Sequence, residues 1–282
     1  MERQKTECGI KVGITRYEYD RIDAINNSIL SVVHAKSPFH AKWNREHDQE
    51  QTPALLEGSA FHTMVLEPDQ FNDRYGVWTG GDRRTKAGKE LWKTFQEETQ
   101  DKDILTNAQF SQVSSMTEAL KGQAFSRFLG DGDKEVALVW DDPATGVRCK
   151  ALIDCANPNV TLSDLKSTND ASLSGFAKSA YNFGYYQQAA FYTSGWKVLT
   201  GEDRKFVFCA VEKSAPYAAA AFYCSDDMIS AGHNAFSSAL DIWAKCVESD
   251  DYPSYSEKVQ RIDLPAWAQA REERVEEYNV GV

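Results

Sequence analysis

The stretch VRCKALIDCANPNVTLSDLKSTND, residues 147–170, contains two apolar runs, ALID and VTLSDLK, on either side of the turn-forming sequence CANPN. Short apolar runs separated by asparagine and proline are typical of strands joined by a turn, so this stretch predicts a β-hairpin. Three charged side chains, Asp154, Asp164 and Lys166, interrupt these runs. A solvated turn explains the asparagines and the proline, but it does not explain these three charges.

The predicted register of the hairpin brings the two aspartates together. With the turn centred on Asn159, Asp154 lies opposite Asp164. The Cβ atoms of directly opposed residues are about 4.5–5.5 Å apart, and like charges at that distance destabilise a sheet. Asp164 and Lys166 are two residues apart on a strand and therefore share a face. The hairpin thus predicts a pair of carboxylates with a lysine beside it.

A divalent cation would neutralise such a pair of carboxylates. Mg²⁺ prefers oxygen ligands and is commonly bound by one or two carboxylates, water and a substrate phosphate. Lys166 beside that ion could orient or deprotonate a water molecule and stabilise charge that develops on phosphorus. These are the components of metal-assisted phosphodiester hydrolysis. The alternative is a solvent-exposed hairpin with an Asp–Lys pair on its outer face, and the spacing alone leaves both open.

The composition of the chain excludes several classes of protein. With 282 residues, 42% hydrophobic and 26% charged, it resembles an ordinary globular protein. No run approaches the roughly 20 apolar residues that span a bilayer, and the polar N-terminus is unlike a signal peptide, so we expect a cytoplasmic protein without membrane contact. The six cysteines include no CxxC pair, which argues against a zinc ribbon. A net charge of −11 argues weakly against nonspecific nucleic-acid binding but allows a local basic channel.

Apolar periodicity and capping residues predict the elements around the hairpin. A helix begins near Asn27 or Ser28 and ends near Pro38, and another has Thr52 as its N-cap and ends before Pro68. The segment 79–98 is predicted to open as a basic, glycine-containing loop and to continue as a helix, and further helices are predicted at 105–122, 174–199 and 226–249. Strands are predicted at 135–140, 147–154 and 160–168, and a hairpin at 205–224.

These elements predict an α/β fold with a small mixed, mostly antiparallel central sheet flanked by helices. We expect a single domain over residues 1–282. Its parts are a helical N-terminal part at 1–130, a region of sheet and helices at 131–250 and a tail at 251–282.

The sequence also resembles a known class of nucleases. The pattern ID, nine residues, then DLK resembles the core motif of the PD-(D/E)XK nuclease superfamily, with Asp154, Asp164 and Lys166 as its acids and lysine. Ile153 stands where the superfamily name has proline, a position that varies. The blocks GSAFHTMVLEP (58–68), GVRCKALID (146–154), LSDLKST (162–168) and YYQQAAFY (185–192) together resemble the RecE-type exonuclease VIII family of phage and prophage. They lie in family order, and the resemblance covers roughly residues 15 to 265.

This resemblance implies further site residues. His62 matches the histidine on an N-terminal helix that completes the metal site, although a lone histidine on an apolar helix is more often a core residue. Gln188 and Tyr192 are four residues apart and so share one helix face, and they match the QxxxY motif of RecB-like nucleases. There the glutamine helps align the metal-bound water and the lysine. The backbone carbonyl of Leu165 is implied as a further ligand.

The activity implied by the resemblance is a Mg²⁺-dependent exonuclease, with Mn²⁺ as a substitute. It would degrade linear double-stranded DNA from the 5′ end and leave 3′ single-stranded overhangs for annealing recombination. Related enzymes form closed rings, so the resemblance also implies a homo-oligomeric ring of three or four subunits that encloses the duplex. A basic channel inside an acidic exterior would fit the net charge. The implied partners are DNA ends and a single-strand annealing protein.

DNA contacts are harder to place from the sequence. The densest basic cluster lies in a glycine-flanked loop and its following helix, where phosphate binding and ordinary solvation are both open. Two further basic residues alternate along the strand that leads to Asp154. The candidate DNA-contacting residues are Arg83, Arg84, Lys86, Lys89, Arg148, Lys150 and Tyr192.

Two rival functions remain. A Cas4-like nuclease shares the histidine, the acids, the lysine and QxxxY, but it carries cysteine ligands for an iron–sulfur cluster, and here Cys246 is the last cysteine and stands alone. The other rival is a catalytically silent module that binds DNA or assembles on the same fold. Intact Asp154, Asp164 and Lys166 argue against it, because a silent copy need keep none of them.

Overall fold

A six-stranded sheet forms the centre of the computed structural model, which describes residues 3–47, 50–158, 161–266 and 268–270. The strand order is β1-β4-β5-β6-β7-β8, and every neighbouring pair is antiparallel except β6 and β7, which are parallel. The strands are β1 Gly9–Lys11, β4 Asp133–Asp141, β5 Arg148–Asn157, β6 Thr161–Thr168, β7 Lys205–Glu212 and β8 Ala219–Tyr223. The predicted α/β fold with a mixed, mostly antiparallel sheet is therefore confirmed.

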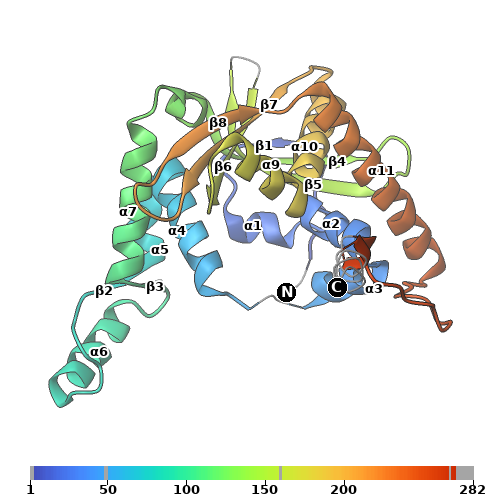
Figure 1. Ribbon diagram of the computed structural model, residues 1–282. Coiled ribbons are helices and arrows are strands. Elements are labelled where there is room, and N and C mark those ends of the chain that lie inside the picture. The colour runs from blue at the N-terminus through green and yellow to red at the C-terminus, as the bar shows by residue number, and fades with distance from the viewer. Residues whose placement is uncertain (1–2, 48–49, 159–160, 267, 271–282) are drawn as a thin grey trace, which may run out of the picture.

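Helices cover both faces of this sheet (Figure 1). One face is covered by α2 Asn27–Ala35, α3 Pro38–Glu46, α9 Leu173–Asn182, α10 Tyr185–Thr200 and α11 Asp226–Ser249. The other is covered by α1 Arg16–Arg21, α4 Pro53–Leu66, α7 Asn107–Lys121 and α8 Arg127–Gly130. Shorter elements are α5 Phe71–Arg74 and the 3₁₀ helices η1 Pro68–Gln70 and η2 Ala124–Ser126.

The side chains of β7 show how the sheet separates two hydrophobic cores. Phe206 and Phe208 belong to the core beneath α10 and α11, whereas Val207 and Cys209 belong to the core beneath α4 and α7. A strand buried on both faces needs apolar side chains at every position, which explains the continuous run FVFCAV in this strand. The sheet is thus held rigidly from both sides.

Most predicted helices begin where their capping residues indicate. Thr52 caps α4 through a hydrogen bond to the backbone N–H of Leu55, and Pro53 occupies the first turn. The predicted helix at 174–199 is instead two helices, α9 and α10. Gly184, between them, has φ of +68°, a conformation that glycine adopts without strain and that ends a helix.

A projecting arm, residues 75–106, is the main feature that the sequence does not predict. Two short parallel strands, β2 Tyr75–Trp78 and β3 Asp103–Thr106, join it to the body, and α6 Lys86–Glu98 lies at its outer end (Figure 1). Trp78 packs edge-to-face against Trp92, with ring centroids 4.9 Å apart, and against Phe95 at 5.2 Å. These rings form a small local core that holds α6 against its strands.

The six cysteines are free thiols. Cys8 is exposed, Cys224 is half-buried and the other four are buried. Across the described ranges, no helix combines the length and apolarity needed to cross a bilayer.

Candidate active site

The hairpin of β5 and β6 has the register that the sequence predicts. Cys155 is paired with Ser163 and Asn157 with Thr161; the turn centre, Asn159, lies outside the described residues. The backbone pairing of the two strands ends at the residues next to Asp154 and Asp164. Beyond that point the carboxylate Oδ2 of Asp154 accepts a hydrogen bond of 2.6 Å from the backbone N–H of Leu165 on β6. A side chain therefore bridges the two strands where their backbone pairing stops.

The alternation of side chains along β5 breaks at Asp154. Ile153 and Ala156 both belong to the core beneath α10, although residues three apart normally point to opposite faces. On the neighbouring strand β4, Glu135 has φ of +48°, an unusual value for a residue other than glycine. The regular alternation assumed from the sequence thus fails at this position, and Asp154 contacts α4 and β6 rather than α10.

Asp164 and Lys166 form a buried network with α10. The Nζ atom of Lys166 lies 2.5 Å from Asp164 Oδ2, and the Gln188 side-chain amide donates a hydrogen bond of 2.6 Å to Asp164 Oδ1. Tyr192 lies one turn further along α10, beside Gln188. The structure therefore brings together the two residues of the QxxxY motif and aims the glutamine at the second aspartate.

His62 reaches this site from the opposite side of the sheet. It lies on α4, and its Nδ1 is 3.5 Å from Asp154 Oδ2. Its side chain is 31% exposed, so it is neither a fully buried core residue nor a free surface residue. Helix α4 and helix α10 thus each deliver one polar side chain, His62 and Gln188, to one of the two aspartates.

The electrostatics of the site show that its negative charge is incompletely compensated. Burial, followed by the charge of Asp164, raises the pKa of Asp154 to about 6, against the opposing effects of His62 and Lys166. Burial acts to lower the pKa of Lys166, but the charges of Asp164 and Asp154 outweigh it and raise that pKa above its usual value. The lysine is therefore held as a cation beside two acids.

Glu135 is a further acid at this site that the sequence analysis missed. Burial, then the charges of Asp154 and Glu67, raise the pKa of Glu135 to about 8. Glu67 is itself paired with Arg74 at 2.6 Å. The signal in the sequence was a glutamate at the head of the apolar run VALVW, one strand before ALID. Its role depends on a backbone conformation that no spacing rule reveals.

The ligand atoms that these residues offer are of the type that a hard divalent cation prefers. Two carboxylates, an imidazole and the Leu165 carbonyl supply mostly oxygen ligands. Asp164 Oδ2 is buried and, apart from its contact with the Lys166 ammonium, accepts no hydrogen bond from any described residue. Within the described chain, no three His, Cys, Asp or Glu side chains stand together as a complete metal-binding group.

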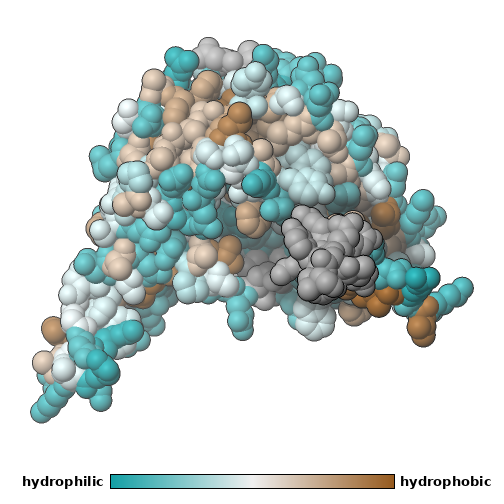
Figure 2. Space-filling model, in the orientation of Figure 1, coloured by the Kyte–Doolittle hydropathy of each residue, from teal (hydrophilic) through white to brown (hydrophobic). Residues whose placement is uncertain are grey.

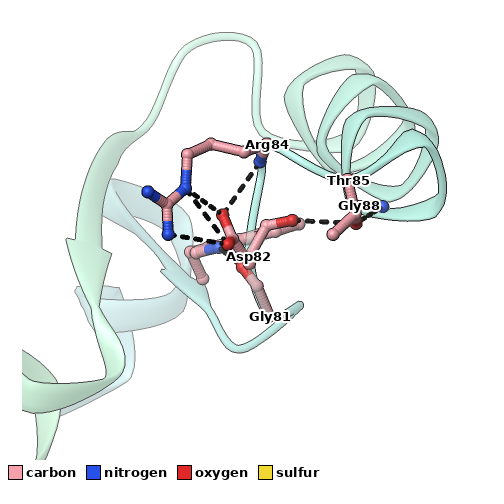
Figure 3. A network of polar contacts seen from close by, with 6 residues as sticks. Gly81, Asp82, Arg84, Thr85 and Gly88 are labelled. Carbon is pink, nitrogen blue, oxygen red and sulfur yellow. Dashed lines mark hydrogen bonds and ion pairs between the residues drawn. The ribbon is translucent and has the colours of Figure 1, made fainter.

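The predicted basic cluster lies on the arm and not at the sheet (Figure 1). Arg83 packs over the ring of Trp92, 4.5 Å from its centroid. Arg84 forms a two-pronged contact with Asp82, whose backbone carbonyl also accepts a hydrogen bond from Thr85 (Figure 3). Lys86 and Lys89 are exposed at the start of α6. The two arginines are thus held in fixed positions by local contacts, with the two lysines beside them.

The other candidate DNA contacts have internal partners. Lys150 is only 5% exposed, and its ammonium donates to three backbone carbonyls at the end of α1, those of Tyr19, Asp20 and Ile22. Arg148 pairs with Asp141 and also donates to the carbonyl of Thr6. Tyr192 packs against the hydrophobic core beneath α10. Lys150 and Tyr192 are therefore held in the interior, whereas Arg148 stays partly exposed, with 35% of its side chain accessible.

A mixed sheet with two acids and a lysine at the point where β5 and β6 stop pairing defines the PD-(D/E)XK fold. Residues 29–265 match the family described as "PDDEXK-like domain of unknown function (DUF3799)", and the chain belongs to this family. A crystal structure from Eubacterium rectale, named "Putative exonuclease", has the same fold. It superposes with a TM-score of 0.61 and 15% sequence identity, covering 92% of this chain and 98% of the other. No curated protein matches the sequence.

Proposed function

We propose that this protein is a metal-dependent deoxyribonuclease. The observation that carries the proposal is the convergence of Asp154, Asp164 and Lys166 in one buried site where negative charge exceeds positive charge. The membership of a PDDEXK-like family and the exonuclease name of a protein with the same fold support it. Hydrolysis of a phosphodiester needs both a cation and a positioned water, and this site has residues suited to hold each.

Each residue of the site has a distinct part in the proposed reaction. Asp154, Asp164, the Leu165 carbonyl and His62 would hold a divalent ion, which supplies charge neutralisation at the scissile phosphate and lowers the pKa of a bound water. Lys166 orients the attacking water and stabilises charge on the phosphate oxygens. Gln188 fixes the Asp164 carboxylate through its 2.6 Å hydrogen bond. Tyr192 lies beside Gln188 on the same helix face and limits the orientations open to it.

The finer form of the proposal rests on the RecE-type resemblance. It is a Mg²⁺-dependent 5′-to-3′ exonuclease on linear duplex DNA that accepts Mn²⁺, leaves 3′ overhangs and acts within a ring of three or four subunits. A single-strand annealing protein would use the overhang. Support comes from the four sequence blocks, which together supply His62, Asp154, Asp164, Lys166 and Gln188 to the site. We also propose that the exposed basic end of the arm contacts DNA phosphates.

The test uses linear duplex DNA labelled at one 5′ end or internally, with Mg²⁺ or Mn²⁺. We expect progressive release of nucleotides from the 5′ end and no attack on a closed circle. Lys166→Ala and Asp164→Ala should each lower the rate by at least about 100-fold, because each removes a group that acts on the reacting atoms. The matched controls Lys245→Ala and Asp227→Ala change exposed residues of α11 and should retain wild-type rates.

Two outcomes would contradict the proposal. Wild-type protein that binds the duplex but leaves it intact with both metals would be a silent DNA-binding module. Cleavage that survives in Lys166→Ala and Asp164→Ala would place the chemistry at other residues. Cleavage of circular DNA would show that the protein is a nuclease but that it does not require a DNA end.

A further inference from the structure

The segment YNFGYY, residues 181–186, carries four aromatic rings in six residues and joins α9 to α10. Tyr181 is 75% exposed and Phe183 is 68% exposed, which are high values for side chains of this size. We propose that Tyr181 and Phe183 form a stacking platform for unpaired bases of DNA bound at the candidate active site. The inference rests on the proposed nuclease function and specifies its substrate as a DNA end whose terminal bases are separated.

The platform is continuous with the candidate catalytic lysine. Lys166 Nζ lies 4.7 Å from the centroid of the Tyr185 ring, and the Tyr185 ring lies 5.7 Å from the ring of Phe183. Two ring contacts therefore lead from the position proposed for the scissile phosphate to an exposed aromatic face. This continuity selects a nucleobase as the occupant, since a strand whose phosphate is beside Lys166 carries its neighbouring bases past these rings.

The backbone holds the platform in one conformation. Gly184, at φ of +68°, makes the sharp turn between the two helices, and a Cβ atom there would lie 3.3 Å from Ser31 Oγ on α2. The backbone N–H of Phe183 donates to the carbonyl of Ser179 at 2.9 Å. Tyr181 stacks on Tyr186, with centroids 6.0 Å apart and planes 16° apart. A platform that is already ordered loses little conformational freedom when a base stacks on it.

The chemistry of the platform favours unpaired bases over paired ones. Stacking on aromatic side chains is tolerant of sequence because every base has a π-face, but that face is available only when the base has left the duplex stack. Lys178, exposed on α9 one turn before Tyr181, adds a positive charge suited to the backbone phosphates. The tryptophans of the arm do not offer such faces, because Trp78 and Trp92 pack against each other.

Two readouts test the proposal. The first is the affinity for two duplexes, measured without divalent metal, each of which carries 2-aminopurine in its terminal base pair. In one duplex the end is fully paired, and in the other the last three positions are mismatched and therefore unpaired. The second is the ratio of initial cleavage rates on the same two ends with Mg²⁺. Wild type should favour the mismatched end in both. Phe183→Ala should lose roughly 5- to 150-fold of that preference in binding, and Tyr181→Ala should lose part of it.

Controls separate stacking from other causes. Phe183→Leu keeps an apolar side chain without a π-face and should behave as Phe183→Ala, whereas Phe183→Trp should retain the preference. Phe39→Ala removes an exposed ring of α3, 52% exposed, and should have no effect. All four variants should keep the wild-type melting temperature, because the altered side chains are largely exposed.

Several results would overturn the proposal. They are a wild type without preference for the mismatched end, a Phe183→Ala variant that keeps the preference, or an equal loss in Phe39→Ala. A change of oligomeric state in Phe183→Ala, measured by sedimentation, would instead make the platform an interface between copies of the chain. If wild type shows the binding preference but cleaves neither end, the platform stands and the nuclease proposal fails.

Discussion

Glu135 is the residue at which backbone and charge are both out of the ordinary. Its φ of +48° is costly for a glutamate, and its carboxyl group is buried near Asp154. Such strain persists only where the surrounding structure enforces it, and here β5 pairs with β4 at Lys134 and Val136, on either side of Glu135. The neutral form of Glu135 fits this environment better than the charged form.

The raised pKa values of Glu135 and Asp154 predict how stability changes with pH without metal. The folded state holds protons up to about pH 8 at Glu135 and about pH 6 at Asp154, whereas the unfolded chain loses them near its usual carboxyl pKa values. The folded state thus binds more protons in this window, so the free energy of unfolding falls as pH rises from about 5 to 8. We expect the melting temperature in EDTA to decrease over that range.

The variant Glu135→Gln isolates this effect. It should raise the melting temperature at pH 8 and flatten the pH dependence, because the amide cannot ionise. The exposed Glu90→Gln on α6 serves as the control and should leave the curve unchanged. A Glu135→Gln protein with the wild-type pH dependence would show that Glu135 does not titrate in this window.

Some residues of the candidate site can be predicted from the sequence and others cannot. Asp154, Asp164 and Lys166 could be found because charges inside apolar runs require an explanation. His62 could be placed only through family resemblance, since nothing in its helix distinguishes it from a core histidine. Glu135 could not be found, because its position depends on the break in alternation at β4 and β5.

At the level of elements, Lys150 fastens helix α1 to the sheet. Its ammonium has three hydrogens and donates to three carbonyls, 2.8, 3.2 and 2.9 Å away, at the end of a helix of only six residues. Positive charge at a helix C-terminus is also favourable to the helix dipole. The lysine on the strand before Asp154, expected from its alternation to face DNA, instead orders the neighbouring helix.

This placement predicts that Lys150→Met weakens the fold more than it weakens DNA binding. The carbonyls of Tyr19 and Ile22 also accept backbone N–H groups, but the Asp20 carbonyl has no other donor among the described residues. A buried carbonyl left without a donor costs about 1–3 kcal/mol, so the melting temperature should drop by several degrees. The affinity of the remaining folded protein for DNA and its dependence on salt should be unchanged. An unaltered melting temperature together with weaker and less salt-dependent DNA binding would indicate that Lys150 contacts DNA.

The break between α9 and α10 illustrates the limit of periodicity. The apolar pattern continues across residues 174–199, and so it predicts one helix. The structure ends α9 at Asn182 because Gly184 adopts a left-handed conformation against α2. A glycine inside a helical pattern is compatible with one continuous helix and with two separate helices. Only the tertiary contact with Ser31 shows that the chain forms two.

For the whole molecule, the distribution of charge matters more than the total. The chain has a net charge of −11, yet residues 82–93 at the outer end of the arm contain five lysines and arginines and two acids. Figure 2 shows the outer end of the arm, around α6, as largely hydrophilic surface. The basic cluster therefore lies away from the acidic body, and at that distance the acidic residues cancel least of its attraction for phosphates.

Charge reversal on the arm tests whether it contacts DNA. Lys86→Glu with Lys89→Glu should weaken duplex binding and reduce the slope of log affinity against log salt by about 2, as two phosphate contacts are lost. The rate at saturating DNA should change little, because α6 lies far from β6, the strand that carries Lys166 (Figure 1). The control Lys205→Glu with Lys245→Glu alters two exposed lysines of the body. An equal effect of both pairs would indicate general electrostatics and not an arm contact.

The overall architecture was largely predictable, and the arm was not. Strand-like runs, turn residues and caps predict the α/β class and the mixed sheet, since each is a local signal. The arm depends on the parallel pairing of β2 with β3, two four-residue strands separated by a helix. Strands so short carry too few residues for an alternation to be recognised.

The exposure of Cys8 has a practical consequence. Burial raises the pKa of the other five thiols, to about 12 for Cys209 and Cys224, so they react slowly with electrophiles. Cys8 precedes the edge strand β1, and its Sγ lies 3.7 Å from Asp141 Oδ2 at the end of β4. A maleimide dye should therefore attach at a single position in the native chain. Energy transfer from that dye to a second dye on a DNA end would show whether individual molecules advance along a duplex.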